Sequence, residues 1–155
     1  MSVAFRRESD EEHLEPKFEL PIPVGPNLVT RAGKSLIDQR IAAIEQDIAA
    51  ATGDDVAPLR RDLRYWHTRQ ATAVVTAAPA DGSVGFGTIV TVRMRGRTRD
   101  IALVGDDEAD PNADRIDFGA PLARALMRAE PGDLLPFGGA EDAIEVLDVK
   151  AIDPA

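Results

Sequence analysis

The spacing of hydrophobic residues changes once along the chain, from a helical period to a strand-like one. Between residues 37 and 73 apolar positions recur every three or four residues, whereas beyond residue 84 they alternate with polar positions. The first spacing is typical of helices that bury one face, and the second is typical of strands with one solvated face. The chain is therefore predicted to be an α+β protein in which the helices precede the sheet.

Two helices are predicted in the first half of the chain. Thr30 is suited to cap the first helix, although Gly33 stands where a capping box has its reciprocal Glu. The turn that follows ends this helix, because Gly53 accepts a left-handed backbone and Asp55 can cap the next helix. We expect an antiparallel helical hairpin with a coiled-coil seam, roughly 30 Å long. The seam positions are Ile37, Ile41, Ile44 and Ile48 in the first helix, and Leu59, Leu63, Trp66, Gln70 and Ala73 in the second.

A small antiparallel sheet crossed by one helix is predicted after residue 84. Residues 88–94 and 98–104 alternate around a turn at 95–97, as the two strands of a hairpin do. Residues 121–127 fit a short helix that begins with Pro and turns Leu122, Ala125 and Leu126 toward the sheet. Further strands are expected at residues 114–118, 133–137 and 143–152.

These elements divide the chain into four predicted segments. Residues 1–27 combine an acidic cluster with four prolines and are expected to be an extended or disordered tail. The helical hairpin occupies residues 28–77, a linker residues 78–83, and the C-terminal domain residues 84–155. An alternative for the tail is an ordered arm that lies on the domain, since Phe18, Leu20, Ile22 and Val24 have alternate spacing.

The composition of the chain restricts the cellular compartment and the binding partners that we expect for it. The net charge is -9, and an acidic surface repels a phosphate backbone, so independent binding to nucleic acid is not expected. The chain has no cysteine, which excludes disulfides and thiolate metal sites. It shows neither the apolar core of a signal peptide nor a run long enough to span a membrane. We expect a cytoplasmic protein without a membrane partner.

Two segments of the second half carry a family resemblance. An acidic loop, Val104-Gly-Asp-Asp-Glu-Ala-Asp110, follows a predicted strand, and Gly119-Ala-Pro-Leu-Ala-Arg-Ala-Leu126 begins the short helix. They resemble the C-terminal signature of the GreA/GreB family of bacterial transcription elongation factors, whose second segment reads Ser-Pro-Leu-Ala-Arg-Ala-Leu. Thr30-Arg-Ala-Gly33 stands where the family usually has Thr-Pro-Glu-Gly at the hairpin start. The resemblance covers about residues 28–152.

The resemblance implies a fold, a partner and a set of site residues. It implies a helical hairpin followed by an FKBP-like C-terminal domain that docks at the secondary channel of RNA polymerase. It also implies that acidic residues at the hairpin tip, here Asp54 and Asp55, help the polymerase active site hold a second Mg²⁺ while backtracked RNA is cut. The chain would then be no enzyme, with no cofactor bound alone and nucleic acid met only through the polymerase. The implied docking residues are Phe118, Gly119, Ala120 and Pro121, and the signature residues are Gly105, Asp106, Asp107, Glu108, Ala109 and Asp110.

The hairpin tip departs from the family pattern. The family tip usually reads Gly-Asp-Leu-Ser-Glu-Asn, with its acidic residues three apart, whereas Asp54 and Asp55 are adjacent. Each arm is also shorter by roughly ten residues, which is about 15 Å of helix. The acidic pair is then better explained as a helix stop and N-cap than as a pair of Mg²⁺ ligands. An alternative function is therefore a non-cleaving competitor of Gre factors, like the regulator of nucleoside diphosphate kinase.

Three further candidates are weighed against simpler interpretations. Arg60, Arg61 and Arg64 could meet nucleic acid or an acidic polymerase surface, or form a solvated helix face. Acidic residues stand at every second position of the acidic loop, at Asp106, Glu108 and Asp110, as they do in a calcium-binding loop. Pro111 stands where such a loop requires Gly, so no metal is expected. Prolyl isomerase activity is disfavoured because only three phenylalanines follow residue 84 to line a pocket.

Overall fold

The computed structural model describes residues 19–154, which divide into two compact units. One unit contains residues 19–24 together with Ile37–Thr72, and the other contains Gly25–Leu36 together with residues 73–154. Most of the predicted tail, including Phe18, lies outside the described residues. Residues 19–27 belong to no helix or strand. None of the helices in residues 19–154 combines the length and apolarity needed to cross a bilayer.

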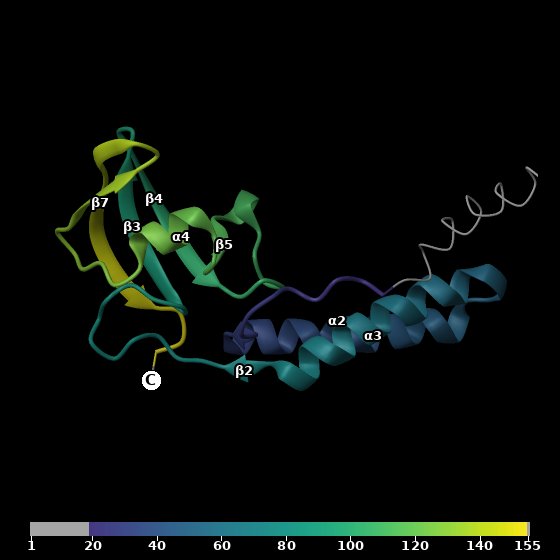
Figure 1. Cartoon of the computed structure of the whole chain (residues 1–155). Coiled ribbons are helices and arrows are strands. Elements are labelled where there is room, and N and C mark those ends of the chain that lie inside the picture. The colour runs from purple at the N-terminus through teal and green to yellow at the C-terminus, as the bar shows by residue number, and fades with distance from the viewer. Residues whose placement is uncertain (1–18, 155) are drawn as a thin grey trace, which may run out of the picture. The chain divides into compact units, whose positions relative to one another are not determined.

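Two helices dominate the first unit. Helix α2 (Arg31–Ala50) is followed by the 3-10 turn η2 (Gly53–Asp55) and by helix α3 (Val56–Thr72), and the two long helices lie side by side (Figure 1). The predicted seam is buried at Ile37 and Ile41 and only half-buried at Ile44 and Ile48, so burial decreases toward the turn. The expected α+β class is confirmed by these helices together with the sheet of the second unit.

Polar contacts also join the two helices. The Gln70 amide donates to the Asp38 carboxylate at 3.0 Å. The Arg40 guanidinium lies 5.6 Å from the centre of the Trp66 ring, within the range of a cation–π interaction. Trp66 is half-buried, as expected for a side chain on the helix-facing seam. Ala73, also predicted on the seam, instead follows the end of α3.

A five-stranded sheet forms the centre of the second unit, with strand order β5-β4-β3-β7-β6. Side chains of the central strands alternate between buried and less buried, which is the period-2 pattern of a sheet with one covered face. Helix α4 contributes Ala123 and Leu126 to the same core (Figure 1). The elements are β3 (Thr88–Met94), β4 (Arg97–Val104), the 3-10 turn η3 (Pro111–Ala113), β5 (Arg115–Asp117), α4 (Pro121–Leu126), β6 (Leu134–Phe137) and β7 (Ala140–Ala151).

The sheet is mixed, so the prediction of an antiparallel sheet is wrong at one strand pair. Strands β4 and β5 pair in parallel, with Leu103 opposite Ile116, whereas the other three pairs are antiparallel. A tight turn after β4 would have made β5 antiparallel, because parallel neighbours need a longer connection. The acidic loop and η3 supply that connection, and they return the chain to the same end of the sheet.

A second, very short sheet was not predicted. Strands β1 (Leu28–Val29) and β2 (Val74–Val75) pair in parallel on either side of the helical segment. The Val74 amide donates to the Asn27 carbonyl, and the Thr76 amide donates to the Val29 carbonyl, both at 2.9 Å. Two residues per strand are too few to show a period in the sequence, so the pattern gave no signal for this pair.

Strand β1 approaches the backbone that leaves β4 very closely. A Cβ atom placed on Gly105 would overlap the carbonyl oxygen of Leu28, and Gly105 itself is buried. Glycine is therefore required here for space, since its φ is not in the left-handed region. The contact holds the end of β4 against the residues that precede helix α2.

We expect Gly105→Ala to lower the free energy of unfolding by about 1–3 kcal/mol, the usual cost of an extra methyl group in a filled site. The matched control is Gly119→Ala, because a Cβ atom there would meet only the Asp117 carboxylate oxygens, at 3.8 and 3.9 Å. That control should change stability by less than about 0.5 kcal/mol. Urea unfolding followed by circular dichroism measures both. Equal losses in the two variants would refute the steric explanation.

Candidate functional site

The beginning of helix α2 is joined to the acidic loop by one hydroxyl group. Thr30 is fully buried, and its hydroxyl accepts a hydrogen bond from the Gly33 amide at 3.0 Å, which confirms it as the N-cap. The same hydroxyl donates to the Glu108 carboxylate at 2.6 Å, although the two residues lie 78 positions apart. The loop thus supplies the acceptor that keeps the capping hydroxyl oriented.

Gly33 stands where a capping box would have a Glu or Gln, and the structure shows what occupies that space. A capping box has Glu or Gln at this position, and its side chain folds back to the N-cap residue. In this structure a Cβ atom on Gly33 would lie 2.7 Å from the nearer Glu108 oxygen. The carboxylate of Glu108 therefore occupies the space that a side chain at position 33 would fill, and it accepts from the Thr30 hydroxyl.

Other carboxylates near this junction also serve the fold. The first amide of helix α2, that of Arg31, donates to the Asp153 carboxylate at 3.1 Å, so a negative charge lies at the positive end of the helix. Asp110 caps the 3-10 turn η3 by accepting from the Asn112 amide at 3.2 Å. Its second oxygen lies 3.6 Å from the Arg115 guanidinium. The signature is thus at least partly a set of structural acceptors.

The predicted docking loop follows directly from strand β5. The Asp117 carboxylate accepts from the Gly119 amide at 3.2 Å, and its carbonyl accepts from the Ala120 amide at 2.8 Å. This turn presents Gly119 and Pro121 at the surface, with Pro121 at the first position of α4. Phe118 is half-buried and packs edge-to-face on Phe86, with ring centres 5.3 Å apart. Two exposed residues therefore sit on a rigid support.

The hairpin tip presents two carboxylates to solvent. Asp54 and Asp55 are exposed in η2, and within residues 19–154 neither carboxylate makes a hydrogen bond or an ion pair. The expected N-cap role of the Asp55 side chain is therefore not found; its backbone amide instead donates to Thr52 at 3.3 Å. Among the described residues no group of three or more His, Cys, Asp or Glu is placed to hold a metal ion.

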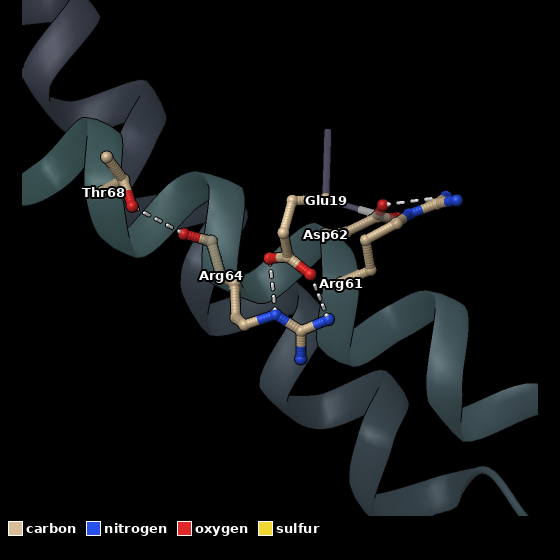
Figure 2. A network of polar contacts seen from close by, with 5 residues as sticks. All are labelled: Glu19, Arg61, Asp62, Arg64 and Thr68. Atoms are coloured by element: carbon tan, nitrogen blue, oxygen red, sulfur yellow. Dashed lines mark hydrogen bonds and ion pairs between the residues drawn. The ribbon is translucent and has the colours of Figure 1, made fainter. Parts of the chain in front are cut away.

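A bidentate ion pair attaches the chain before β1 to helix α3. Both oxygens of the Glu19 carboxylate accept from the Arg64 guanidinium, at 2.6 and 2.8 Å (Figure 2). The same figure shows Arg61 paired with its neighbour Asp62 at 3.3 Å. Leu20 is half-buried and, with Ile22, lines a groove of about 400 Å³ beside Tyr65 and Thr68.

The titration of Glu19 follows from this contact. The hydrogen bonds from the Arg64 guanidinium hold the pKa of the Glu19 carboxyl below its usual value. The pKa of Arg64 is raised by the same bonds. Because the carboxyl pKa is lowered on folding, the contribution of the pair is complete above the ordinary Glu value, about 4.3, and is lost as the pH falls through the folded value.

The predicted site residues fall into separate groups. The signature and the docking loop share the second unit, where the Phe118 amide donates to the Val104 carbonyl at 2.9 Å. The tip aspartates belong to the first unit. Sequence reasoning missed the Glu19–Arg64 pair and the role of Glu108. The absence of a capping-box Glu at Gly33 was the one available signal that an acceptor from elsewhere was needed.

Comparison with known proteins identifies relatives of the second half of the chain. Residues 79–152 match the family model described as "Transcription elongation factor, GreA/GreB, C-term". The chain is 37% identical over 98 residues to transcription elongation factor GreA of Pseudomonas putida, which is 59% of this chain and 60% of that protein. It is 35% identical over 98 residues to GreB of Neisseria meningitidis, with the same coverage. The chain therefore spans about 60% of the length of these curated relatives.

Solved structures give a looser match. The crystal structure of GreA factor homolog 1 from Thermus thermophilus covers 82% of this chain and 100% of its own, at 15% sequence identity and a TM-score of 0.39. A whole-chain superposition at that score establishes no shared architecture.

We expect Thr30→Val, which keeps the side-chain volume and removes the hydroxyl, to lower the free energy of unfolding by about 1–2 kcal/mol through loss of the N-cap. Thr30→Ser is the matched control, because it keeps the hydroxyl and removes one buried methyl group, and it should cost less. Urea unfolding of both variants gives the comparison. A loss in the Ser variant equal to or above that of the Val variant would show that packing, and not the hydroxyl, holds the junction.

Proposed function

We propose that this chain, whose residues 79–152 match the C-terminal model of the GreA/GreB family, is a transcription elongation factor of that family, which binds RNA polymerase at its secondary channel and modulates elongation. The observation that carries this proposal is the order of parts. Two adjacent helices that end in an exposed acidic turn precede the family domain. A factor of this kind needs one part that docks and one that reaches into the channel.

In this proposal the C-terminal domain is the docking part. The loop at residues 118–121 offers an exposed Gly119 and Pro121 held by the Asp117 turn and by the packing of Phe118. A rigid, partly apolar loop is suited to bind a protein surface without a large ordering cost. The proposed partner is RNA polymerase, and the chain acts as a protein-binding regulator, not as a free-standing enzyme.

The charge of the chain supports this choice of partner. A net charge of -9 opposes direct binding to a phosphate backbone. Contact with RNA or DNA is therefore proposed to occur only inside the polymerase complex, in the cytoplasm. The proposed role of the exposed tip aspartates, Asp54 and Asp55, is to share a Mg²⁺ ion with the polymerase active site, where two metals can activate water and stabilise a leaving oxygen.

The geometry of the tip favours a second candidate function, a non-cleaving competitor of Gre factors. Asp54 and Asp55 follow each other in a 3-10 turn, whose three residues per turn direct neighbouring side chains about 120° apart. Ligation of Mg²⁺ requires oxygens at about 2.1 Å in near-octahedral geometry, which diverging carboxylates do not supply together. Helices of 20 and 17 residues also give arms of only about 30 and 25 Å.

We expect Pro121→Glu to weaken binding to RNA polymerase by at least about tenfold while leaving the fold intact. An acidic residue is favourable in the first turn of a helix, so α4 should remain stable, whereas the new charge faces the docking surface. Affinity is measured by titrating labelled polymerase with the full chain. Ala140→Glu, an equal charge change at another exposed position, is the control and should bind as the wild type does. Unchanged affinity in Pro121→Glu would exclude this loop from docking.

Transcript cleavage on backtracked elongation complexes separates the two candidate functions. We expect the double change Asp54→Asn and Asp55→Asn to abolish any cleavage that the wild-type chain stimulates, while polymerase affinity stays within about twofold, because the removed carboxylates act on Mg²⁺ and not on docking. Equal cleavage by the variant and the wild type would remove both residues from the mechanism. A wild-type chain that suppresses cleavage by a GreA factor and stimulates none would establish the competitor.

A further inference from the structure

Residues 19–24, which we call the strap, lie along helix α3 and cover part of its surface. The strap makes a bidentate ion pair between Glu19 and Arg64 (Figure 2). Beside this pair, Leu20 and Ile22 line the groove with Tyr65 and Thr68. An anion and an apolar side chain thus occupy neighbouring positions on α3, as a docked peptide segment would.

The strap is built for weak and reversible attachment. The side chains of Glu19 and Arg64 are 57% and 53% exposed, so solvent screens the pair and limits its effect on an equilibrium to about fivefold. Ile22 is 43% exposed and Val24 fully exposed, so the apolar contribution is also small. Pro21 and Pro23 restrict the backbone and reduce the entropy lost when the strap docks. A structural staple would be expected to bury more.

The chemistry of the covered surface indicates what else it can bind. A planar guanidinium that donates to both oxygens of Glu19 matches any other carboxylate equally well. The anion that Arg64 already holds is a carboxylate, bound through both oxygens, so the geometry favours a carboxylate as the external ligand.

We propose that the surface formed by Arg64, Tyr65 and Thr68 is a docking site for a carboxylate-bearing segment of RNA polymerase, and that the strap masks it with Glu19 as an internal competitor. The proposal rests on the proposed function for the identity of the partner. Use of this surface, in addition to the loop at residues 118–121, then requires the strap to leave α3, and its contribution to the affinity is reduced by the fraction of chains in which the strap is closed.

The test measures strap release and polymerase affinity in the same full-length variants. The chain has no cysteine, so Ile22→Cys accepts a single nitroxide label whose mobility reports the strap. Glu19→Gln and Arg64→Gln should both increase that mobility. Glu141→Gln, the same change at an exposed carboxylate on β7, should leave it unchanged. Equal mobility in the wild type and Glu19→Gln would refute the claim that the Glu19–Arg64 pair holds the strap on α3.

Affinity then decides whether the strap masks a docking site. Glu19→Gln should bind RNA polymerase about two- to fivefold more tightly than the wild type, the range expected for one exposed ion pair. Arg64→Gln should gain nothing, because it frees the strap and also removes the docking cation. If Glu19→Gln releases the strap but binds RNA polymerase as tightly as the wild type does, the strap does not mask a docking site, although it does attach to α3. If Glu19→Gln gains affinity for single-stranded RNA and not for RNA polymerase, the proposed carboxylate ligand is wrong. If no variant binds RNA polymerase, the proposed function is wrong as well.

Discussion

The hydroxyl of Thr30 connects the beginning of helix α2 to the acidic loop, and the local structure on both sides depends on it. It caps the helix through the Gly33 amide and holds Glu108 in the space that a larger side chain at position 33 would fill. The close contact of Gly105 with Leu28 joins the same two segments at a second point. Two glycines and one hydroxyl therefore determine how the loop after β4 meets the chain that enters α2.

This arrangement separates the acidic residues of the chain into two kinds. Glu108, Asp110 and Asp153 accept hydrogen bonds from helix starts or from the capping hydroxyl, so their charges serve the fold. Asp54 and Asp55 lie exposed at the tip and make no such contact within the described residues. The acidic loop after β4 thus contributes to the fold through Glu108 and Asp110, whereas the tip carboxylates face solvent.

Local features of the fold could be predicted from the sequence, and distant pairings could not. The period-2 segment 88–94 became β3 with the same bounds, and the Pro at position 121 begins α4, because alternation and capping act over a few residues. The direction of β5 depended on the path of the preceding loop, and the β1–β2 pair is only two residues long.

The same limit applied to the candidate sites. The tip, the signature and the docking loop were predicted as segments, but the Thr30–Glu108 and Glu19–Arg64 contacts join residues 78 and 45 positions apart. No local period encodes such pairs.

Those separations have a consequence for how the chain acquires its structure. The first turn of α2 needs Glu108 for its capping hydroxyl and Asp153 for the Arg31 amide, and the second of these partners is 122 positions away. Contacts between distant residues form late, since the intervening chain must be ordered before they gain anything. During synthesis the N-terminal segments leave the ribosome first. Helix α2 is the first helix of the described chain to be synthesised. The first turn of α2 therefore gains its last hydrogen-bond partner, Asp153, only after the residues that follow β7 have been made.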